Sequence, residues 1–568
     1  MRVRPRYALA ILLALAVLHT WPIAAAPWRH SLNHNADAQL CAWTIAWIAH
    51  TLPRDPAHVF DGNIFAPEPA TLTYSEPLLP QAVLGAPILW LGGSPVLAFN
   101  MVLIAGLVLT AWSAWFVVWK WTGSTNAALV AGALAAFNVH LLTRLPHLQA
   151  AHAWGLPLTI YFASRLVERT TARDVVLLGL VVAGTAANSI YWLALAGLIV
   201  VVSIAVATAT GRWRQGLAMA AASGLGLALA APALWPYLRV AASGATRPIE
   251  MVAQFSATPS GYLTSTSRLH RGWSAVFFRD DVNVLFAGIL AVALAAFGLW
   301  TLRRSGEPRR RLEPFSFSSS EPPAGIRPNV SRPMQVLPYE EMRTVLAILL
   351  SIAVIGIVLS FGPATGVYQW LYDWALPLRG LRAAARFGFL YLIAVALLAG
   401  IGAAWLERRL SSTRARTMLI VALLAGVSIE AWHSPIRTQP FEGVPPVYSL
   451  VAEETTPVML VEVPFFPADA IFENGEYVLN ATAHWKPVMN GTSGATPMSY
   501  RRRAESFWYF PRDWAIESMK KEGATHVMVH LERFGAEAAE VMSALAGRQD
   551  LQLLGGDAKG HRLYKFAR

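Results

Sequence analysis

The chain has little cysteine and little charge. Cys41 is the one cysteine among 568 residues, and Asp, Glu, Lys and Arg together make up 14% of the sequence. A lone cysteine excludes an internal disulfide, so any exported part must be stabilised by its core alone. Soluble domains carry about 25% charged residues, so the low charge excludes an ordinary cytosolic enzyme. With 55% hydrophobic residues and a mean hydropathy of +0.43, the composition indicates a polytopic membrane protein.

Common catalytic motifs are missing as well. The sequence contains no P-loop, no GxSxG, no HExxH and no CxxC. It also shows no internal repeat, which argues against a transporter built from duplicated halves. Function must therefore be inferred from single residues and from their place relative to the membrane.

Long apolar runs dominate the first three quarters of the sequence. Most of them have the roughly 17–25 residues that are needed to cross the hydrocarbon core of a bilayer. The runs at 153–167 and 174–188 are shorter. Together the runs predict about eleven membrane spans, at 7–26, 95–118, 124–142, 153–167, 174–188, 190–209, 215–236, 284–303, 344–362, 386–404 and 416–432.

Basic residues gather in the short segments between these runs. With eleven spans and the N-terminus inside, the basic clusters all fall on the cytoplasmic side, as the positive-inside rule requires. The net charge of +12 is therefore an orientation signal, and we expect no nucleic-acid partner. The short apolar run at 78–92 holds two prolines, and we expect it to be an interfacial or re-entrant helix on the outer side.

This topology divides the chain into two predicted domains. Residues 1–432 form a transmembrane module, with a first outer loop at 28–94 that holds interfacial helices. A segment rich in Ser, Pro and Arg at 303–343 is expected to be a cytoplasmic linker. Residues 433–568 have ordinary charge content and are expected to form a soluble α/β domain on the outer side, which is the periplasm of a bacterium.

The predicted outer domain mixes strands with helices. Buried strands are expected at 458–463 and 525–530, where apolar residues dominate, and a closing hairpin is expected at 551–567. The whole chain is thus predicted to be a multi-pass protein of the bacterial inner membrane, with the C-terminal domain outside.

The acid Asp37 lies early in the first outer loop, at the expected start of a helix that carries Trp43 and Trp47. Tryptophans one turn apart are typical of a helix in the lipid headgroup region. A carboxylate there can act as a general base or can hold a divalent cation, and the cofactor is otherwise left open. Asp37 can instead be a helix N-cap or a first-turn acid that the helix dipole stabilises. The neighbouring Asn35 is a candidate substrate ligand.

Glu76 is the second acid of interest in this loop. It just precedes the apolar run at 78–92, so it can cap that helix. If it points toward Asp37 instead, the two residues form the carboxylate pair that glycosyl chemistry commonly uses.

Candidate ligands for an anionic group lie in later outer segments. Arg144 and His147 lie between two predicted spans, where a guanidinium can bind a phosphate in bidentate fashion. Arg382 and Arg386 are four residues apart at the mouth of a span, so they share one helical face. An anion between these two arginines is one arrangement that relieves their repulsion, and pairing with a nearby acid is the other. His484 is a candidate residue of a turn over the site.

This arrangement resembles the GT-C superfamily of glycosyltransferases, which use polyprenyl-phosphate-linked sugars. The likeness is carried by the topology, by the early acid of the outer loop and by the short outer helix at 78–92. At the level of residues, the chain is similar to an uncharacterised bacterial branch of that superfamily. The patches that carry this similarity are Asp37, Trp47, Asp55-Pro56, 60–65, Pro67, 74–76, Arg386-Phe387, 484–487 and Asn490-Gly491.

The resemblance implies that Asp37 is the catalytic acid or base and that the donor is a polyprenyl-phosphate-linked sugar. We hypothesise an inverting transfer of a hexose or pentose to a glycan, lipid or protein acceptor of the cell envelope. Arg144, or Arg382 with Arg386, would then bind the donor phosphate. The alternative is a non-catalytic membrane protein that binds or translocates a lipid-linked glycan or assists envelope assembly, and it predicts polar residues lining a path through the spans.

Overall fold

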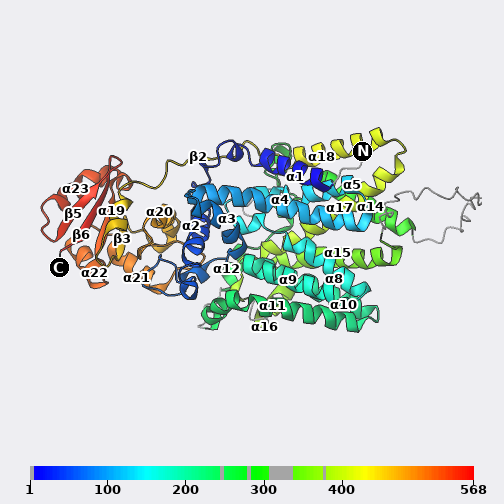
Figure 1. Cartoon of the computed structure of the whole chain (residues 1–568), viewed down its shortest axis with the longest axis horizontal. Coiled ribbons are helices and arrows are strands. Elements are labelled where there is room, and N and C mark those ends of the chain that lie inside the picture. Colours follow the sequence, from blue (N-terminus) through cyan, green and yellow to red (C-terminus); the bar gives the residue numbers. More distant parts are fainter. Residues whose placement is uncertain (1–4, 243–247, 278–282, 306–336, 375–378, 568) are drawn as a thin grey trace, which may run out of the picture.

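The computed structural model describes the chain except residues 1–4, 243–247, 278–282, 306–336, 375–378 and 568. Figure 1 shows a bundle of long helices and, beyond one end of it, the C-terminal part of the chain. Most of the predicted linker at 303–343 lies outside the described residues.

Each predicted apolar run contains a helix of this bundle. The bundle helices are α1 (Pro5–His19), α4 (Pro95–Thr122), α5 (Thr125–Ala136), α8 (Gly155–Glu168), α9 (Ala172–Asn188), α10 (Ile190–Ala209), α11 (Trp213–Ala242), α14 (Ile289–Ser305), α15 (Tyr339–Ser360), α17 (Phe389–Arg409) and α18 (Thr413–Glu430). Among the described residues, five of these helices are long and apolar enough to cross a membrane: α4, α10, α11, α15 and α17. This is expected of a multi-pass membrane protein, and the count of eleven spans stays a prediction.

The outer faces of the bundle are apolar, and its helices pack closely. Leu180, Val201 and Leu217 are exposed on α9, α10 and α11, as suits side chains that face lipid. Between α14 and α17, a Cβ atom at Gly402 would lie 2.1 Å from the backbone oxygen of Leu294. Only glycine fits at that crossing, which is the small-residue packing that helices use in membranes.

Short helices lie between the bundle and the C-terminal part. Helix α2 (Ala36–Thr51) contacts α3 (Leu79–Trp90) and α4 on one side and α20 (Gly475–Asn480) on the other. The sequence favours a headgroup position for Trp43 and Trp47, but the structure buries both rings between protein elements. The indole N–H of Trp43 donates to Asn63, and that of Trp47 to the backbone oxygen of Val59.

The remaining short helices of the N-terminal and central parts connect these elements. They are α6 (Val139–Leu142), α7 (Leu148–Ala151), α12 (Ile249–Gln254), α13 (Arg271–Ser274) and α16 (Gly366–Trp374). Helices α6 and α7 form the connection between α5 and α8 in which Arg144 and His147 lie.

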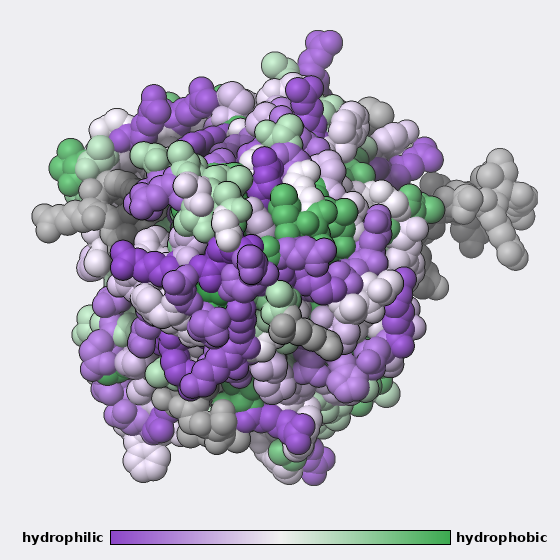
Figure 2. All heavy atoms as spheres, turned by 90° about the vertical axis from the view of Figure 1, so that its left-hand side faces the viewer, coloured by the Kyte–Doolittle hydropathy of each residue, from purple (hydrophilic) through white to green (hydrophobic). Residues whose placement is uncertain are grey.

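The C-terminal part contains a mixed four-stranded sheet. Its strands are β3 (Leu460–Val463), β4 (His526–His530), β5 (Leu551–Gly556) and β6 (His561–Phe566), in the order β3-β4-β6-β5. Strand β3 is parallel to β4, and the other pairs are antiparallel. Strands thus form where the sequence predicts them. The accompanying helices are α19 (Tyr448–Glu453), α20, α21 (Met498–Phe507), α22 (Asp513–Lys521) and α23 (Ala538–Ala546). Figure 2 shows that this end of the molecule is covered mostly by hydrophilic residues.

Two distant sequence patches meet where the segment at 28–94 contacts the C-terminal part. The backbone N–H of Phe65 donates to the oxygen of Asn490 at 2.9 Å, and that of Ala66 to the oxygen of Val488 at 2.9 Å. In return, the N–H of Val488 donates to the oxygen of Asn63 at 2.7 Å. A second tie joins β1 (His30–Ser31) to β2 (Gln439–Pro440). These bonds fix the C-terminal part against the segment at 28–94.

Candidate active site

Asp37 lies in the first turn of α2, and its side chain keeps half of its surface exposed. Asn35 is the N-cap of this helix, because its side-chain oxygen accepts a hydrogen bond from the N–H of Asp37 at 2.8 Å. The cap thus falls to Asn35, which leaves the Asp37 carboxylate available to other partners. The dipole of a 16-residue helix favours a negative charge at this position.

His147 contacts the carboxylate of Asp37. Its Nε2 lies 3.2 Å from Oδ2 of Asp37, and its side chain is 29% exposed. Burial lowers the pKa of His147 to about 4, although Asp37 opposes this effect. The ring is therefore neutral at pH 7, so its contact with the carboxylate is not a pairing of opposite charges. His147 thus orients Asp37 without neutralising it.

Three arginines lie close enough to His147 to act on its charge. The positive charges of Arg386, Arg144 and Arg382 all lower the pKa of His147. Arg144 follows α6 and donates to the backbone oxygen of His140 at 3.4 Å. Arg382 and Arg386 come from the segment before α17, more than two hundred residues later in the chain. The structure therefore gathers guanidinium groups from two distant segments near Asp37.

Arg386 is held by an aromatic ring and by a carboxylate. Its guanidinium carbon lies 4.0 Å from the centre of the Tyr191 ring, and its Nη1 lies 3.5 Å from Oε1 of Glu76. The hydroxyl oxygen of Tyr191 accepts hydrogen bonds from the backbone N–H groups of Arg382 and Ala383, each at 3.0 Å. Tyr191 thus fixes the whole arginine segment. Sequence reasoning missed this residue, because a tyrosine at the start of an apolar run carries no local signal.

Glu76 does not cap α3, because the N-cap of that helix is Leu78. The described contacts include none between Glu76 and Asp37, and the predicted carboxylate pair stays a prediction. Instead, Oε2 of Glu76 accepts a hydrogen bond from the N–H of Ile190 at 2.8 Å, at the N-terminus of α10. Burial raises the pKa of Glu76, although Arg386 lowers it. Glu76 is therefore a buried anchor for Arg386 and α10.

The C-terminal part packs directly against the start of α2. A Cβ atom at Gly475 would lie 2.1 Å from Oε1 of Gln39 and 3.1 Å from Cβ of Ala36, so α20 approaches within one residue of Asp37. His484 is placed elsewhere: its ring is buried and stacks on Tyr448. Its Nδ1 accepts a hydrogen bond from the N–H of Lys486. None of its described contacts reaches the Asp37 cluster.

Polar residues inside the bundle are engaged in internal hydrogen bonds. Asn126 donates to Glu407 at 2.9 Å, and Asn138 caps α6. Asn188 donates to the backbone oxygen of His152 at 2.7 Å and accepts from Gln81. These contacts tie helices together, so these three residues provide no support for a polar path through the spans.

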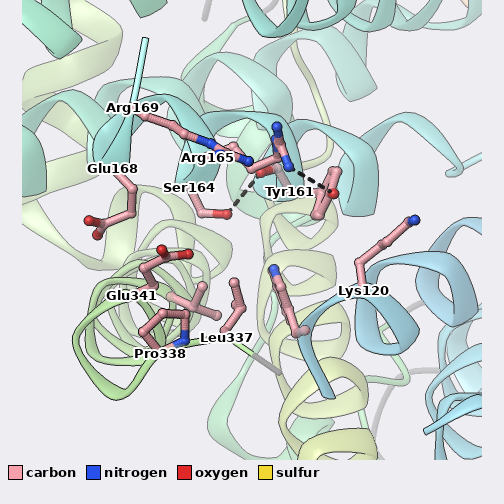
Figure 3. A pocket seen from close by; sticks show the side chains of 11 residues that line it. Lys120, Tyr161, Ser164, Arg165, Glu168, Arg169, Leu337, Pro338 and Glu341 are labelled. Carbon is pink, nitrogen blue, oxygen red and sulfur yellow. Dashed lines mark hydrogen bonds between the residues drawn. The ribbon is translucent and has the colours of Figure 1, made fainter. Parts of the chain in front are cut away.

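A cavity of about 470 Å³ lies at the other end of the bundle. It is formed between the C-terminal ends of α4 and α8 and the N-terminus of α15, and Figure 3 shows the charged side chains that line it. Several of them have internal partners. Arg165 binds Asp174 at 2.9 Å, and Glu168 binds Arg212 at 2.9 Å. Asp37 lies near the opposite end of α4, so this cavity is not part of the candidate active site.

Two comparisons of the sequence find no match, whereas a comparison of structures finds several similar folds. No protein-family model matches the sequence, and no curated protein matches it. The structure matches the arabinofuranosyltransferase AftD from Mycobacteria with a TM-score of 0.58 and 14% identity. The match covers 100% of this chain but 40% of the AftD chain, so this chain spans well under half of the AftD length.

Two further solved structures are less similar. The oligosaccharyltransferase AglB from Archaeoglobus fulgidus matches at 12% identity with a TM-score of 0.49, over 99% of this chain and 74% of that one. ArnT from Cupriavidus metallidurans matches at 12% identity with a TM-score of 0.40, over 98% and 97%. The shared fold therefore rests on AftD, a GT-C glycosyltransferase, and the resemblance to that superfamily is confirmed for the fold.

Proposed function

We propose that the chain is a membrane glycosyltransferase that uses a polyprenyl-phosphate-linked sugar donor at the outer face of the bacterial inner membrane. The observation that carries this proposal is the convergence at one end of the bundle. There the half-exposed carboxylate of Asp37 contacts His147, and Arg144, Arg382 and Arg386 lie within electrostatic reach of that histidine. A base beside a group of cations suits a reaction in which a hydroxyl attacks and a phosphate leaves.

In the proposed reaction, Asp37 removes the proton of the acceptor hydroxyl as its oxygen attacks the anomeric carbon. The bond between that carbon and the donor phosphate breaks, and the phosphate leaves with the electron pair. Arginine side chains stabilise the charge that develops on the phosphate. A single displacement of this kind inverts the anomeric configuration. His147 keeps the base oriented, and Glu76 keeps Arg386 in place.

A divalent cation at Asp37 remains part of the proposal. Oδ2 of Asp37 and Nε2 of His147 are 3.2 Å apart, which fits two ligands of one ion. If such a cation takes part, it would supply positive charge for the leaving phosphate. The acceptor, a glycan, lipid or protein of the envelope, would reach Asp37 from the exposed side of its carboxylate.

The experiment is donor turnover by the purified chain in lipid nanodiscs. Undecaprenyl-phosphate-linked pentoses and hexoses with a radiolabelled sugar are supplied with an envelope extract as acceptor, with and without EDTA. The proposal expects that one donor is consumed and that free undecaprenyl phosphate is released. A chain that binds a donor at saturation but never consumes one would be the non-catalytic binder of lipid-linked glycans, and the proposal would fail.

A further inference from the structure

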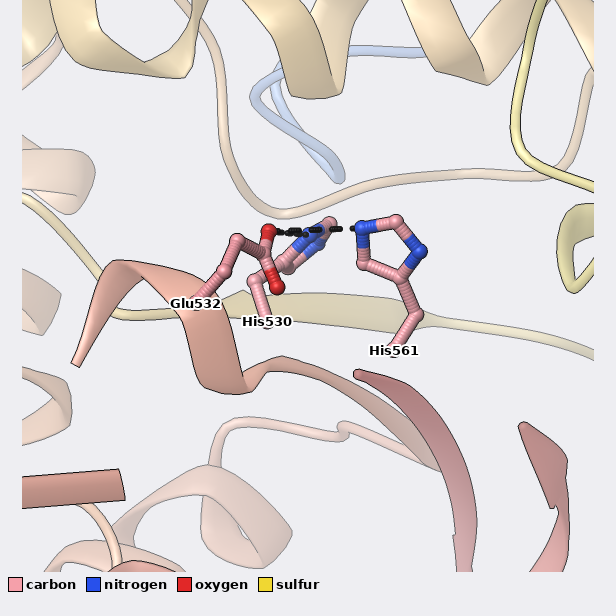
Figure 4. Close-up of side chains that lie close together, drawn as sticks. All are labelled: His530, Glu532 and His561. Carbon is pink, nitrogen blue, oxygen red and sulfur yellow. Dashed lines mark ion pairs between the residues drawn. The ribbon is translucent and has the colours of Figure 1, made fainter. Parts of the chain in front are cut away.

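A second cluster of titratable side chains lies in the C-terminal sheet, away from Asp37. His530 ends β4 and His561 begins β6, and the antiparallel register places them opposite each other. Glu532 follows in the turn after β4. Its Oε1 lies 3.5 Å from Nδ1 of His530 and 3.3 Å from Nε2 of His561. Figure 4 shows the three side chains pointing toward one another.

In each imidazole ring, the nitrogen that faces away from Glu532 contacts another carboxylate. Nε2 of His530 lies 2.6 Å from Oε2 of Glu462, which is fully buried in β3 and also accepts a hydrogen bond from Tyr448. Nδ1 of His561 lies 2.6 Å from Oδ2 of Asp557. The other oxygen of Asp557 accepts the N–H groups of Lys559 and His561, which fixes that carboxylate.

The contacts with Glu462 and Asp557 determine the protonation of the inner nitrogens, which are the two that face Glu532. A carboxylate only accepts hydrogen bonds, so each ring uses its N–H on Glu462 or Asp557. The inner nitrogen of a neutral ring then presents a lone pair, and both lone pairs face the same oxygen of Glu532. Nδ1 of His530 is buried, and no hydrogen-bond partner is described for it. Such a convergence of lone pairs requires a cation between them.

We propose that this cluster is a binding site for a divalent transition-metal ion of the zinc type, with His530, His561 and Glu532 as ligands. The three ligand atoms lie within 4.8 Å of one another. In a tetrahedral zinc site with bonds of about 2.0–2.1 Å, neighbouring ligands are roughly 3.3–3.4 Å apart. The distances of 3.3 and 3.5 Å between the histidine nitrogens and Oε1 of Glu532 match this separation between ligands. Carboxylates behind metal-bound histidines are the usual outer partners of such sites.

The alternative cation is a proton. Without metal, a proton on one of the rings can occupy the space between the nitrogens and Glu532. Metal ligands must be deprotonated, so binding of a metal ion is expected to release protons.

The expected role of the ion is to stabilise the attachment of β6 to β4. Its ligands come from the end of β4, the turn that follows it and the start of β6, so one ion joins all three. The histidines are buried, whereas the side chain of Glu532 is 43% exposed. A fourth coordination position can therefore reach water. The site does not depend on the proposed glycosyl transfer.

The test is calorimetric titration of Zn²⁺ into the full chain after treatment with a chelator, in two buffers of different ionisation enthalpy. We expect one equivalent of Zn²⁺ to bind at this cluster with release of protons, and we expect a rise in the thermal midpoint. Glu532→Gln and His561→Gln should weaken binding by more than tenfold, and Asp557→Asn by about 10–100-fold. Glu537→Gln, an exposed acid a few residues along, is the matched control and should bind like the wild type.

Two results would overturn the metal site. One is the absence of stoichiometric Zn²⁺ binding at micromolar concentration, which leaves the proton as the cation. The other is equal binding by Glu532→Gln and the wild type. If His561→Gln fails to fold, the exposed Glu532 still decides the question, because its substitution leaves the buried histidines and their partners intact.

Discussion

At the scale of the residue, position in a helix decides what each acid can do. Asn35 takes the cap of α2, which leaves the Asp37 carboxylate half exposed and in contact with His147. The sequence predicts the acid at a helix start, because caps and first turns are local features. It does not predict His147 as its partner, since that contact spans more than a hundred residues of chain.

His561 gives a prediction about pH for the metal-free protein. Its pKa is raised from 6.5 to about 9 in the folded chain. A histidine with a raised pKa adds stability that is fully present below pH 6.5 and is lost as the pH rises through about 9. Thermal unfolding with a chelator present, measured from pH 6 to 10, should show the midpoint falling across this range. The Asp557→Asn variant should show a weaker dependence, and an unchanged slope would contradict the assignment.

At the scale of the element, the site is assembled from segment ends that only the fold brings together. The apolar helices were predictable, since each depends on its own run of residues. The contacts of Glu76 were not, because its partners are the start of α10 and the segment before α17. A carboxylate that precedes a helix in sequence looks like that helix's cap, but tertiary structure directs it to another helix.

The Glu76 anchor can be tested by removing its charge. Glu76→Gln keeps an acceptor for the N–H of Ile190 but leaves Arg386 without its carboxylate. Breaking a fully buried pair costs about 3–5 kcal/mol, and the cost here should be smaller because Arg386 is 21% exposed. We expect a lower thermal midpoint. The double variant with Arg386→Gln should recover part of this loss, and a midpoint for Glu76→Gln equal to that of the wild type would refute the anchor.

At the scale of the whole molecule, the contacts between the segment at 28–94 and the C-terminal part constrain the topology. Residues 63–66 are hydrogen-bonded to residues 488–490, so both segments lie on one side of the membrane. The chain must then cross the bilayer an even number of times between them. The five long apolar helices all fall in that interval, and five is odd. If all five cross, at least one shorter apolar helix must cross as well, as the prediction of eleven spans requires.

Reporter fusions test this topology. Alkaline phosphatase, which is active outside the cytoplasm, is inserted after residue 60 or fused after residue 568, and a fluorescent protein that folds in the cytoplasm is placed after residue 212. We expect all three fusions to be active. If the two phosphatase sites reported opposite sides, the contact between 63–66 and 488–490 would be impossible in the membrane.

The central claim is that Asp37 is the catalytic base of a sugar transferase. Its most direct test is the rate of transfer by Asp37→Asn, which keeps the size and the helix but removes the basicity. Asp55→Asn changes an exposed acid of the same loop and serves as the control. Loss of a general base should lower kcat by about 10²–10⁴-fold, with normal expression and an unchanged thermal midpoint. Transfer by Asp37→Asn at the rate of the wild type would contradict the account.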